Sequence, residues 1–70
     1  MTTGEKIKQI RISKRLTQSE LGKRCGMADS QIGVYERGES KPREATLARI
    51  AEALDVDLAA LKQQQKGATP

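Results

Sequence analysis

The sequence predicts an all-α fold, a compact bundle of about five short helices. Three observations predict it. Apolar residues recur at intervals of three and four, the stretch Thr17-Gln18-Ser19-Glu20 has the form of a helix capping box, and Gly26 and Gly38 stand where helices would have to end. Seventy residues suffice for one small domain with a single core.

The first helix is expected from about residue 3 to residue 15, with Thr3 as its N-cap. Ile7 and Ile10 lie on the face that would be buried, whereas Ile12 falls outside this stripe and is expected to be partly exposed. The helix therefore presents one apolar side to the rest of the bundle.

The second helix begins at the capping box and is only about two turns long, because Gly26 can adopt the left-handed conformation that ends a helix. Leu21 and Cys25 are four residues apart and share its buried face. Gly22 lies beside them and would let the next helix approach closely. Cys25 is therefore predicted to be a small buried hydrophobe.

A turn through Met27 and Ala28 leads into a third helix, from about residue 29 to residue 37, in which Ile32 and Tyr35 face inward. Its remaining side chains are mostly short and polar. They are expected to face outward and comprise Asp29, Ser30, Gln31, Gly33, Val34 and Arg37. Such a slim helix would fit a DNA major groove, which is about 12 Å wide.

The fourth helix is expected from about residue 44 to residue 54, after a polar loop that contains Pro42. Its apolar residues Leu47, Ile50, Ala51 and Leu54 follow core spacing. Asp55 would then take the left-handed conformation. A short fifth helix would begin at Asp57 and end near Leu61, so that residues 1–61 form the domain and residues 62–70 a disordered tail.

The composition excludes several kinds of site. With one cysteine and no histidine, the chain offers neither a disulfide nor a zinc site, and no metal or cofactor is expected. No nucleophile stands beside a base and no phosphate-binding loop is present, so an enzyme is not expected. The longest apolar run is four residues, which is too short to span a membrane, and a cytoplasmic location is expected.

The positive charge is concentrated in the N-terminal part of the chain. The total is +4, and residues 1–43 carry ten basic side chains against five acidic ones, whereas residues 44–70 carry three against four. A polyanion would therefore bind the N-terminal part. An ordinary solvated basic face is the alternative interpretation of the charge alone.

The central stretch resembles the helix-turn-helix DNA-binding domains of the Cro and lambda-repressor type, also called the XRE family. The resemblance covers roughly residues 4 to 61, without a gap in the spacing. The matching residues are Leu16, Thr17, Gln18, Glu20, Leu21, Gly22, Gly26, Ile32, Tyr35, Glu36, Arg37, Gly38, Lys41, Pro42, Thr46, Leu47, Ile50, Ala51, Ala53 and Leu54.

The resemblance implies a lambda-repressor-like bundle in which the second and third helices form the helix-turn-helix, and a role for particular residues. The base-reading residues would be Asp29, Ser30 and Val34. Contacts to the DNA backbone would come from Gln18, Ala28, Gln31, Arg37, Lys41 and Arg43. Arg11 would form a structural salt bridge with Glu36, tying the first helix to the third.

The implied function is a transcriptional regulator of a bacterium or phage, namely a repressor. It would bind a two-fold-symmetric operator as a homodimer that forms either in solution or only on DNA. The alternative is a protein-interaction module, such as the antitoxin of a toxin-antitoxin pair or an adaptor with weak or no DNA binding. Departures from the family pattern at Ala28, Asp29 and Gly33 support this alternative. The operator sequence is not fixed by the residues.

Overall fold

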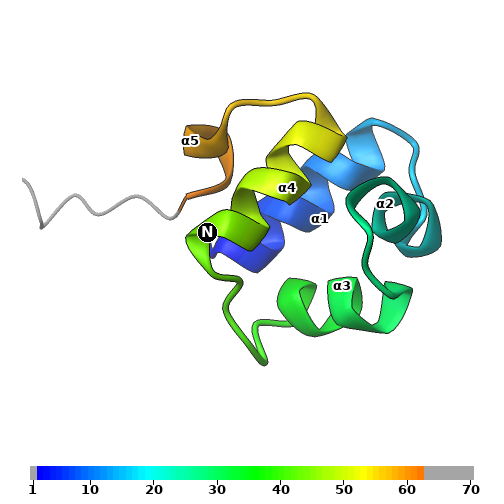
Figure 1. The fold of residues 1–70 in the computed structure, drawn as a ribbon, viewed down its shortest axis with the longest axis horizontal. Helices are drawn as coiled ribbons and strands as arrows, with labels where there is room; N and C mark the ends of the chain where they lie inside the picture. The colour runs from blue at the N-terminus through cyan, green and yellow to red at the C-terminus, as the bar shows by residue number, and fades with distance from the viewer. Residues whose placement is uncertain (1, 63–70) are drawn as a thin grey trace, which may run out of the picture.

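The computed structural model describes residues 2–62, which form five helices and no strand. The helices are α1 (Thr3–Ser13), α2 (Gln18–Cys25), α3 (Asp29–Glu36), α4 (Glu44–Leu54) and α5 (Leu58–Leu61). Figure 1 shows α1 and α4 crossing the middle of the molecule, with α3 below them and α2 at one end. The predicted all-α bundle, with α2 and α3 as its helix-turn-helix, is confirmed.

Two capping boxes fix the starts of α1 and α2. At α2 the Thr17 hydroxyl accepts the amide of Glu20 at 3.0 Å, and the Glu20 carboxylate accepts the amide of Thr17 at 2.8 Å, as the sequence predicts. The N-cap of α1, however, is Thr2 and not Thr3. Thr2 stands three positions before Glu5, and the two residues form a second capping box. The Thr2 amide donates to the Glu5 carboxylate at 2.9 Å, and the Glu5 amide donates to the Thr2 hydroxyl at 3.1 Å.

A residue in the left-handed conformation follows each of the helices α1 to α4 within two positions of its end. Gly26 has φ 72° and Gly38 has φ 78°, so both glycines predicted to end helices adopt the backbone that favours glycine. Asp55 ends α4 with φ 61°, as expected from its place in the sequence. Arg15 also has a positive φ, 59°, because the chain turns sharply after α1 into the short link to α2.

The core takes at least one aliphatic side chain from every helix. Six of them are less than 2% exposed, and these are Ile7, Leu21, Ile32, Ile50, Leu54 and Leu61. Cys25 joins this core at 7% exposure, as predicted, and burial raises the pKa of its thiol. Tyr35 is only half-buried at the edge of the core. Ile12 is 54% exposed, in agreement with its place off the apolar stripe.

Two glycines allow helices to approach with no side chain between them. A Cβ atom on Gly4 of α1 would lie 2.1 Å from the carbonyl oxygen of Tyr35 in α3. A Cβ atom on Gly22 of α2 would lie 2.5 Å from the carbonyl oxygen of Met27 in the turn. Both distances are far below van der Waals contact, so α1 and the turn before α3 are held by backbone contacts that any larger residue would disrupt.

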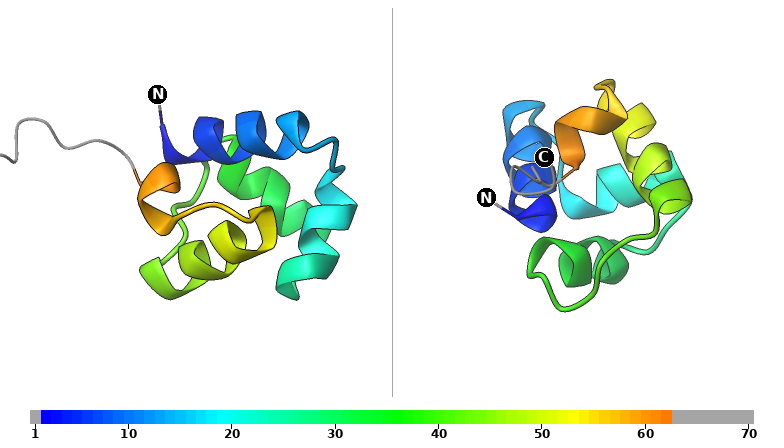
Figure 2. Two further views of the ribbon diagram at one scale, coloured as in Figure 1. Left: turned by 90° about the horizontal axis from the view of Figure 1, so that it is seen from above. Right: turned by 90° about the vertical axis from the view of Figure 1, so that its left-hand side faces the viewer.

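The packing leaves one face of α3 on the outside of the molecule. α3 packs against α2 and α1, and α4 packs against α2, α1 and α5. In the right-hand view of Figure 2, α1 lies on the left and α4 on the right, and α3 lies below both of them. Of the helices within residues 2–62, none has the length and apolar character needed to cross a membrane.

The end of α5 is attached to the two long helices. The Lys62 carbonyl accepts a hydrogen bond from Lys6 at 2.6 Å, and the Lys62 ammonium pairs with Glu44 at 3.0 Å. The first residue of the predicted disordered tail is therefore held against α1 and α4. The rest of that tail, residues 63–70, lies outside the described residues.

Candidate nucleic-acid interface

The exposed side of α3 carries the residues predicted to read bases. Ser30 and Val34 are four residues apart and share one helical face, which Arg37 continues at the C-cap. Asp29 and Ser30 are exposed, whereas Val34 is half-buried. The N-terminal turn of α3 is therefore the most accessible part of the helix, and it is the part that base readers occupy in helix-turn-helix proteins.

Gly33 lies inside the interface of α2 and α3 and not on the outward face, contrary to the sequence prediction. A Cβ atom at this position would lie 3.1 Å from an Arg37 guanidinium nitrogen and 3.5 Å from the Gln18 side-chain amide. Two long side chains from α2 and the end of α3 cover the glycine. Helical geometry places Gly33 about 100° around the axis from the buried Ile32. This position is neither clearly inward nor clearly outward, so the sequence pattern alone could not reveal that Gly33 is covered.

A buried network joins three helices behind the exposed face. Glu36 of α3 accepts from the Arg11 guanidinium of α1 at 2.6 and 3.1 Å, and from the Gln18 amide of α2 at 3.1 Å. Arg11 also donates to the Leu16 carbonyl at 2.7 Å. The Glu36 and Arg11 side chains are only 3% and 11% exposed. The pair that the resemblance implies is thus formed, and its charges are fully paired.

This network orients the N-terminus of α2, where an anion would be favoured. In the first turn of a helix the amides have no preceding carbonyl partner, and here the side chain of Thr17 satisfies only the amide of Glu20. The amides of Gln18 and Ser19 therefore remain available. Since Gln18 donates its side-chain NH2 to Glu36, its side chain is held beside this end of the helix.

Arg37 is not a free cation in this structure. Its guanidinium donates to the Glu39 carboxylate at 2.8 and 3.3 Å, and both side chains are more than half exposed. These hydrogen bonds raise the pKa of Arg37 and lower the pKa of Glu39 below its ordinary value of 4.5. A phosphate that contacts Arg37 must therefore share the guanidinium with Glu39 or replace it.

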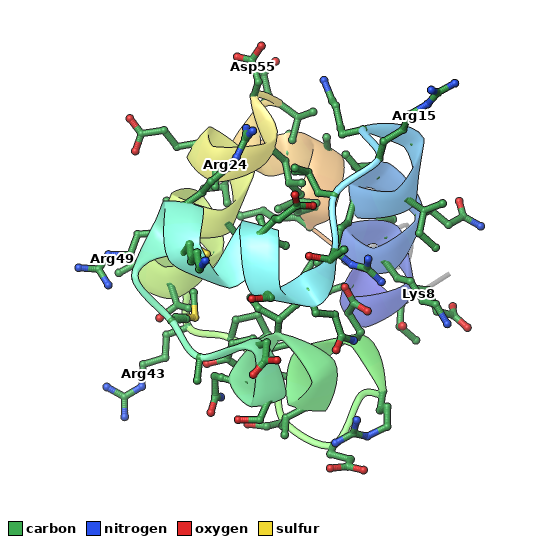
Figure 3. The ribbon with its side chains drawn as sticks, turned by 90° about the vertical axis from the view of Figure 1, so that its right-hand side faces the viewer. Lys8, Arg15, Arg24, Arg43, Arg49 and Asp55 are labelled. Carbon is green, nitrogen blue, oxygen red and sulfur yellow. The ribbon has the colours of Figure 1, made fainter. Side chains whose placement is uncertain are left out.

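The remaining predicted backbone contacts lie around the ends of α3. Ala28 is its N-cap and makes no side-chain capping bond, so any contact from Ala28 must come from its backbone. Gln31 is half-buried, whereas Lys41 and Arg43 are exposed in the loop before α4 and in its N-cap. Figure 3 shows the Arg43 side chain extending away from the body of the molecule at the level of α3.

Sequence reasoning missed Glu39, which bears directly on the predicted site. Arg37 and Glu39 are two residues apart and do not face each other within a helix. They meet only because Gly38 turns the chain through a left-handed conformation between them. The signal available in the sequence was an acid adjacent to a predicted helix stop, which is too common to indicate a pair.

Comparison with known proteins places this geometry in a family. The helix-turn-helix profile HTH_3 matches residues 7–61, which cover most of α1 and all of α2 to α5. The chain belongs to the HTH_3 helix-turn-helix family. The site described above thus lies within the segment shared by the family.

The curated relatives of this HTH_3 chain include a phage repressor. The immunity repressor protein of Bacillus phage phi105 is 34% identical over 61 residues, which are 87% of this chain but 42% of the repressor. The chain therefore spans less than half the length of that curated relative.

Two solved structures resemble almost the whole chain. The P22 c2 repressor, in complex with a synthetic operator, superposes with a TM-score of 0.84 at 28% identity, over 93% of this chain and 98% of the other. The biofilm master regulator SinR, in complex with DNA, superposes with a TM-score of 0.76 at 34% identity. This match covers 83% of this chain and 97% of the SinR chain. Both similarities include the α2–α3 unit.

Proposed function

We propose that this HTH_3 chain is a transcriptional repressor that binds double-stranded DNA in a sequence-specific manner, with α3 in the major groove. The observation that carries the proposal is the exposed first turn of α3 together with the free amides at the start of α2. The buried network of Arg11, Glu36 and Gln18 holds that start of α2 against the C-terminal half of α3. Two similar domains, the P22 c2 repressor and SinR, were solved with DNA.

The proposed contacts divide by chemistry. Ser30 can donate to or accept from a base edge, Val34 can pack on a thymine methyl group, and Asp29 can accept from a cytosine amino group. The amides at the start of α2, together with Lys41 and Arg43, would contact phosphates on the two sides of the groove. Direct readout by these short side chains is worth roughly 1 to 3 kcal/mol per contact.

We further propose that two copies bind one operator, on half-sites about 34 Å apart. The binding unit is residues 1–61, and the copies are brought together by the DNA. The chain would act on the DNA of a bacterial cell or of a phage inside it. The proposed activity needs no cofactor, since every contact named comes from the chain itself.

The decisive experiment is selection of duplexes from a random pool, carried out at low and at near-physiological salt. The proposal expects an enriched site with two-fold symmetry and an affinity that falls steeply with salt. The variants Ser30→Ala and Val34→Ala should each relax the preference at one base pair without changing the salt dependence. An absence of enrichment, with tight capture of a protein partner, would instead support the antitoxin or adaptor function.

A further inference from the structure

The proposed DNA surface includes an acidic side chain that has no role in building the fold. Four acids lie on α2 and α3 or directly after them. Glu20 completes a capping box, Asp29 stands in the first turn of α3, and Glu36 is buried in an ion pair. Glu39 follows the end of α3, caps no helix and is exposed. A carboxylate at this place repels the DNA backbone unless it is paired.

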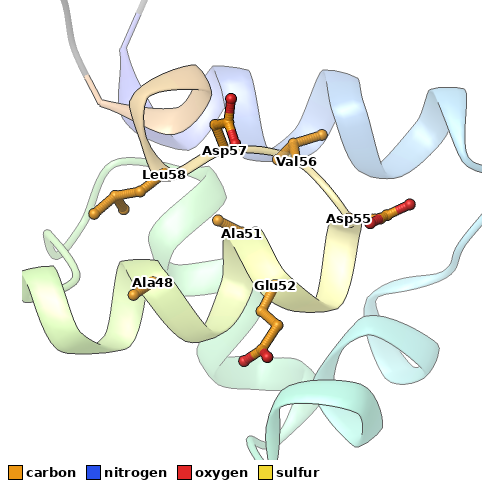
Figure 4. A pocket seen from close by; sticks show the side chains of 7 residues that line it. All are labelled: Ala48, Ala51, Glu52, Asp55, Val56, Asp57 and Leu58. Carbon is orange, nitrogen blue, oxygen red and sulfur yellow. The ribbon is translucent and has the colours of Figure 1, made fainter.

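Other exposed acids of the chain gather away from α3. Glu52, Asp55 and Asp57 stand around a hollow between α4 and the link to α5, as Figure 4 shows. In Figure 3, Asp55 lies at the opposite end of the molecule from α3. Salt therefore screens these charges from a duplex at α3 more than it screens the charge of Glu39.

The turn after α3 fixes the backbone of Glu39 beside Arg37. The Glu39 amide donates to the Val34 carbonyl at 3.1 Å. The Gly38 amide donates to the Tyr35 carbonyl at 3.1 Å, and the two bonds together form a Schellman motif. Gly38 supplies the left-handed conformation that this motif requires. The backbone thus returns Glu39 to the end of α3.

The Arg37 guanidinium is folded back over Gly33. Its Nη1 nitrogen lies 3.1 Å from the place that a Gly33 Cβ atom would occupy, and the Gln18 side-chain amide lies 3.5 Å from the same place. The other two nitrogens, Nε and Nη2, donate to the two carboxylate oxygens of Glu39 at 2.8 and 3.3 Å. One nitrogen is therefore turned toward α2, and Glu39 occupies the other two.

A bidentate contact between Arg37 and DNA needs a nitrogen that Glu39 already holds. A guanidinium presents two forks of parallel donors, Nε with Nη2 and Nη1 with Nη2, and both forks include Nη2. A phosphate placed on Nη2 next to Glu39 would bring two anions together, and like charges in contact are disfavoured. Arg37 therefore has to leave Glu39 before it can bind DNA in this way.

We propose that Glu39 keeps Arg37 away from DNA, so that the guanidinium reaches a duplex only by exchanging the Glu39 carboxylate for an acceptor on the DNA. Arg37 is the only cation in residues 29–37, so the pair neutralises the positive charge that α3 would otherwise present. The inference rests on the proposed DNA binding, and it adds Glu39 as a positioning residue that lowers affinity through Arg37.

A double-mutant cycle on DNA affinity tests the inference. The wild type, Glu39→Gln, Arg37→Gln and the double variant are compared by fluorescence anisotropy, on the most enriched duplex and on an unrelated duplex of the same length. The gain from Glu39→Gln should be about two to five times larger with Arg37 in place than with Arg37→Gln, because only then is an exposed ion pair broken on binding.

The matched control is Glu44→Gln. Glu44 is likewise exposed and paired, with Lys62 at 3.0 Å, and it stands at the start of α4. Its removal also lessens the general repulsion of DNA, but it breaks no pair with Arg37. The effect of Glu44→Gln on affinity should therefore be the same with and without Arg37→Gln. All of these positions are exposed, so circular dichroism should show the wild-type fold.

Equal gains from Glu39→Gln in the two backgrounds would overturn the inference, because Glu39 would then act on DNA only through its own charge. A loss of affinity would also overturn it, since Glu39 would then hold Arg37 in place for DNA. Failure of the proposed function looks different. Equal affinity of the wild type for both duplexes would contradict sequence-specific binding while the cycle still decides the role of Glu39, and no binding to either duplex would contradict both.

Discussion

Glu36 connects the fold to the proposed site, because it receives donors from two other helices. Its carboxylate is bound by Arg11 and by Gln18, and almost none of it reaches solvent. A buried carboxylate of this kind is costly unless it is fully paired. The same hydrogen bonds that satisfy its charge also place the Gln18 side chain at the start of α2.

Replacing Arg11 by methionine should destabilise the domain by about 3–5 kcal/mol, because the Glu36 charge stays buried with its main partner removed. Urea unfolding followed by circular dichroism measures this loss. Much of it should be recovered in the double variant Arg11→Met with Glu36→Leu, in which no buried charge is left.

The matched control is Arg37→Met, which removes the cation of the exposed Arg37–Glu39 pair. Its unfolding midpoint should stay close to that of the wild type, since exposed pairs contribute little. If Arg37→Met cost as much stability as Arg11→Met, burial would not be the reason for the effect.

Glu20 makes the stability of the domain depend on pH. The Thr17 amide donates to its carboxylate, and this hydrogen bond holds the pKa of Glu20 below its ordinary value of 4.5. The folded state thus favours the ionised form. The resulting stabilisation is present above pH 4.5 and is lost as the pH falls through the lower folded-state pKa.

A comparison of the wild type with Glu20→Gln by thermal unfolding, between about pH 2 and pH 7, tests this capping-box contribution. The glutamine variant should lose less stability than the wild type between neutral and acidic pH, because its amide does not titrate. Parallel curves for the two proteins would show that the Glu20 carboxylate makes no pH-dependent contribution.

At the scale of the helices, the packing depends on glycines whose neighbours differ in kind. Gly4 of α1 meets backbone oxygen at the end of α3, whereas Gly33 of α3 meets the ends of two flexible side chains. A backbone carbonyl within a helix cannot move without displacing that helix, but a guanidinium can rotate away. The two glycines are similarly buried, but we expect Gly33 to tolerate a larger residue better than Gly4 does.

The variant Gly4→Ala should lose about 1–3 kcal/mol of stability, since α1 must move away from α3. Gly33→Ala should be neutral or stabilising by up to about 1 kcal/mol, because alanine favours the helix and Arg37 can give way. Chemical unfolding of both variants measures the difference. Equal losses would show that helix packing does not distinguish the two sites.

At the scale of the whole molecule, the cations near α3 are separated from those at the opposite end. Figure 3 shows Arg43 at the level of α3 and Arg15 at the top, near the C-terminal end of α1. Both side chains are exposed, so a glutamine can replace either arginine without disturbing the core. They form a matched pair for measuring where a duplex lies on the protein.

On a duplex selected by the wild type, Arg43→Gln should weaken binding to all sequences alike and reduce the slope of log affinity against log salt by about 1. Arg15→Gln should leave both quantities unchanged. Fluorescence anisotropy at several salt concentrations measures them. If Arg15→Gln had the larger effect, DNA would have to approach the molecule from the side of α1 and not from α3.

Much of the fold could be predicted because its signals are local. The capping box at Thr17, the glycine stops at Gly26 and Gly38 and the apolar spacing of α4 each involve residues at most a few positions apart, and the structure has them as predicted. The N-cap of α1 was misplaced by one residue, since two threonines stand together there and only Thr2 has an acid three positions later.

The sequence by itself determined the five helices, most of their ends, the side of α3 that carries Ser30 and Val34, and the family to which the chain belongs. Only the tertiary structure decided that Gly33 is covered by the Gln18 and Arg37 side chains and that Glu39 binds Arg37. The physical reason is the separation along the chain between the residues that interact. Caps and stops act within one helical turn, whereas cover, pairing and surface shape arise where residues distant in the chain meet.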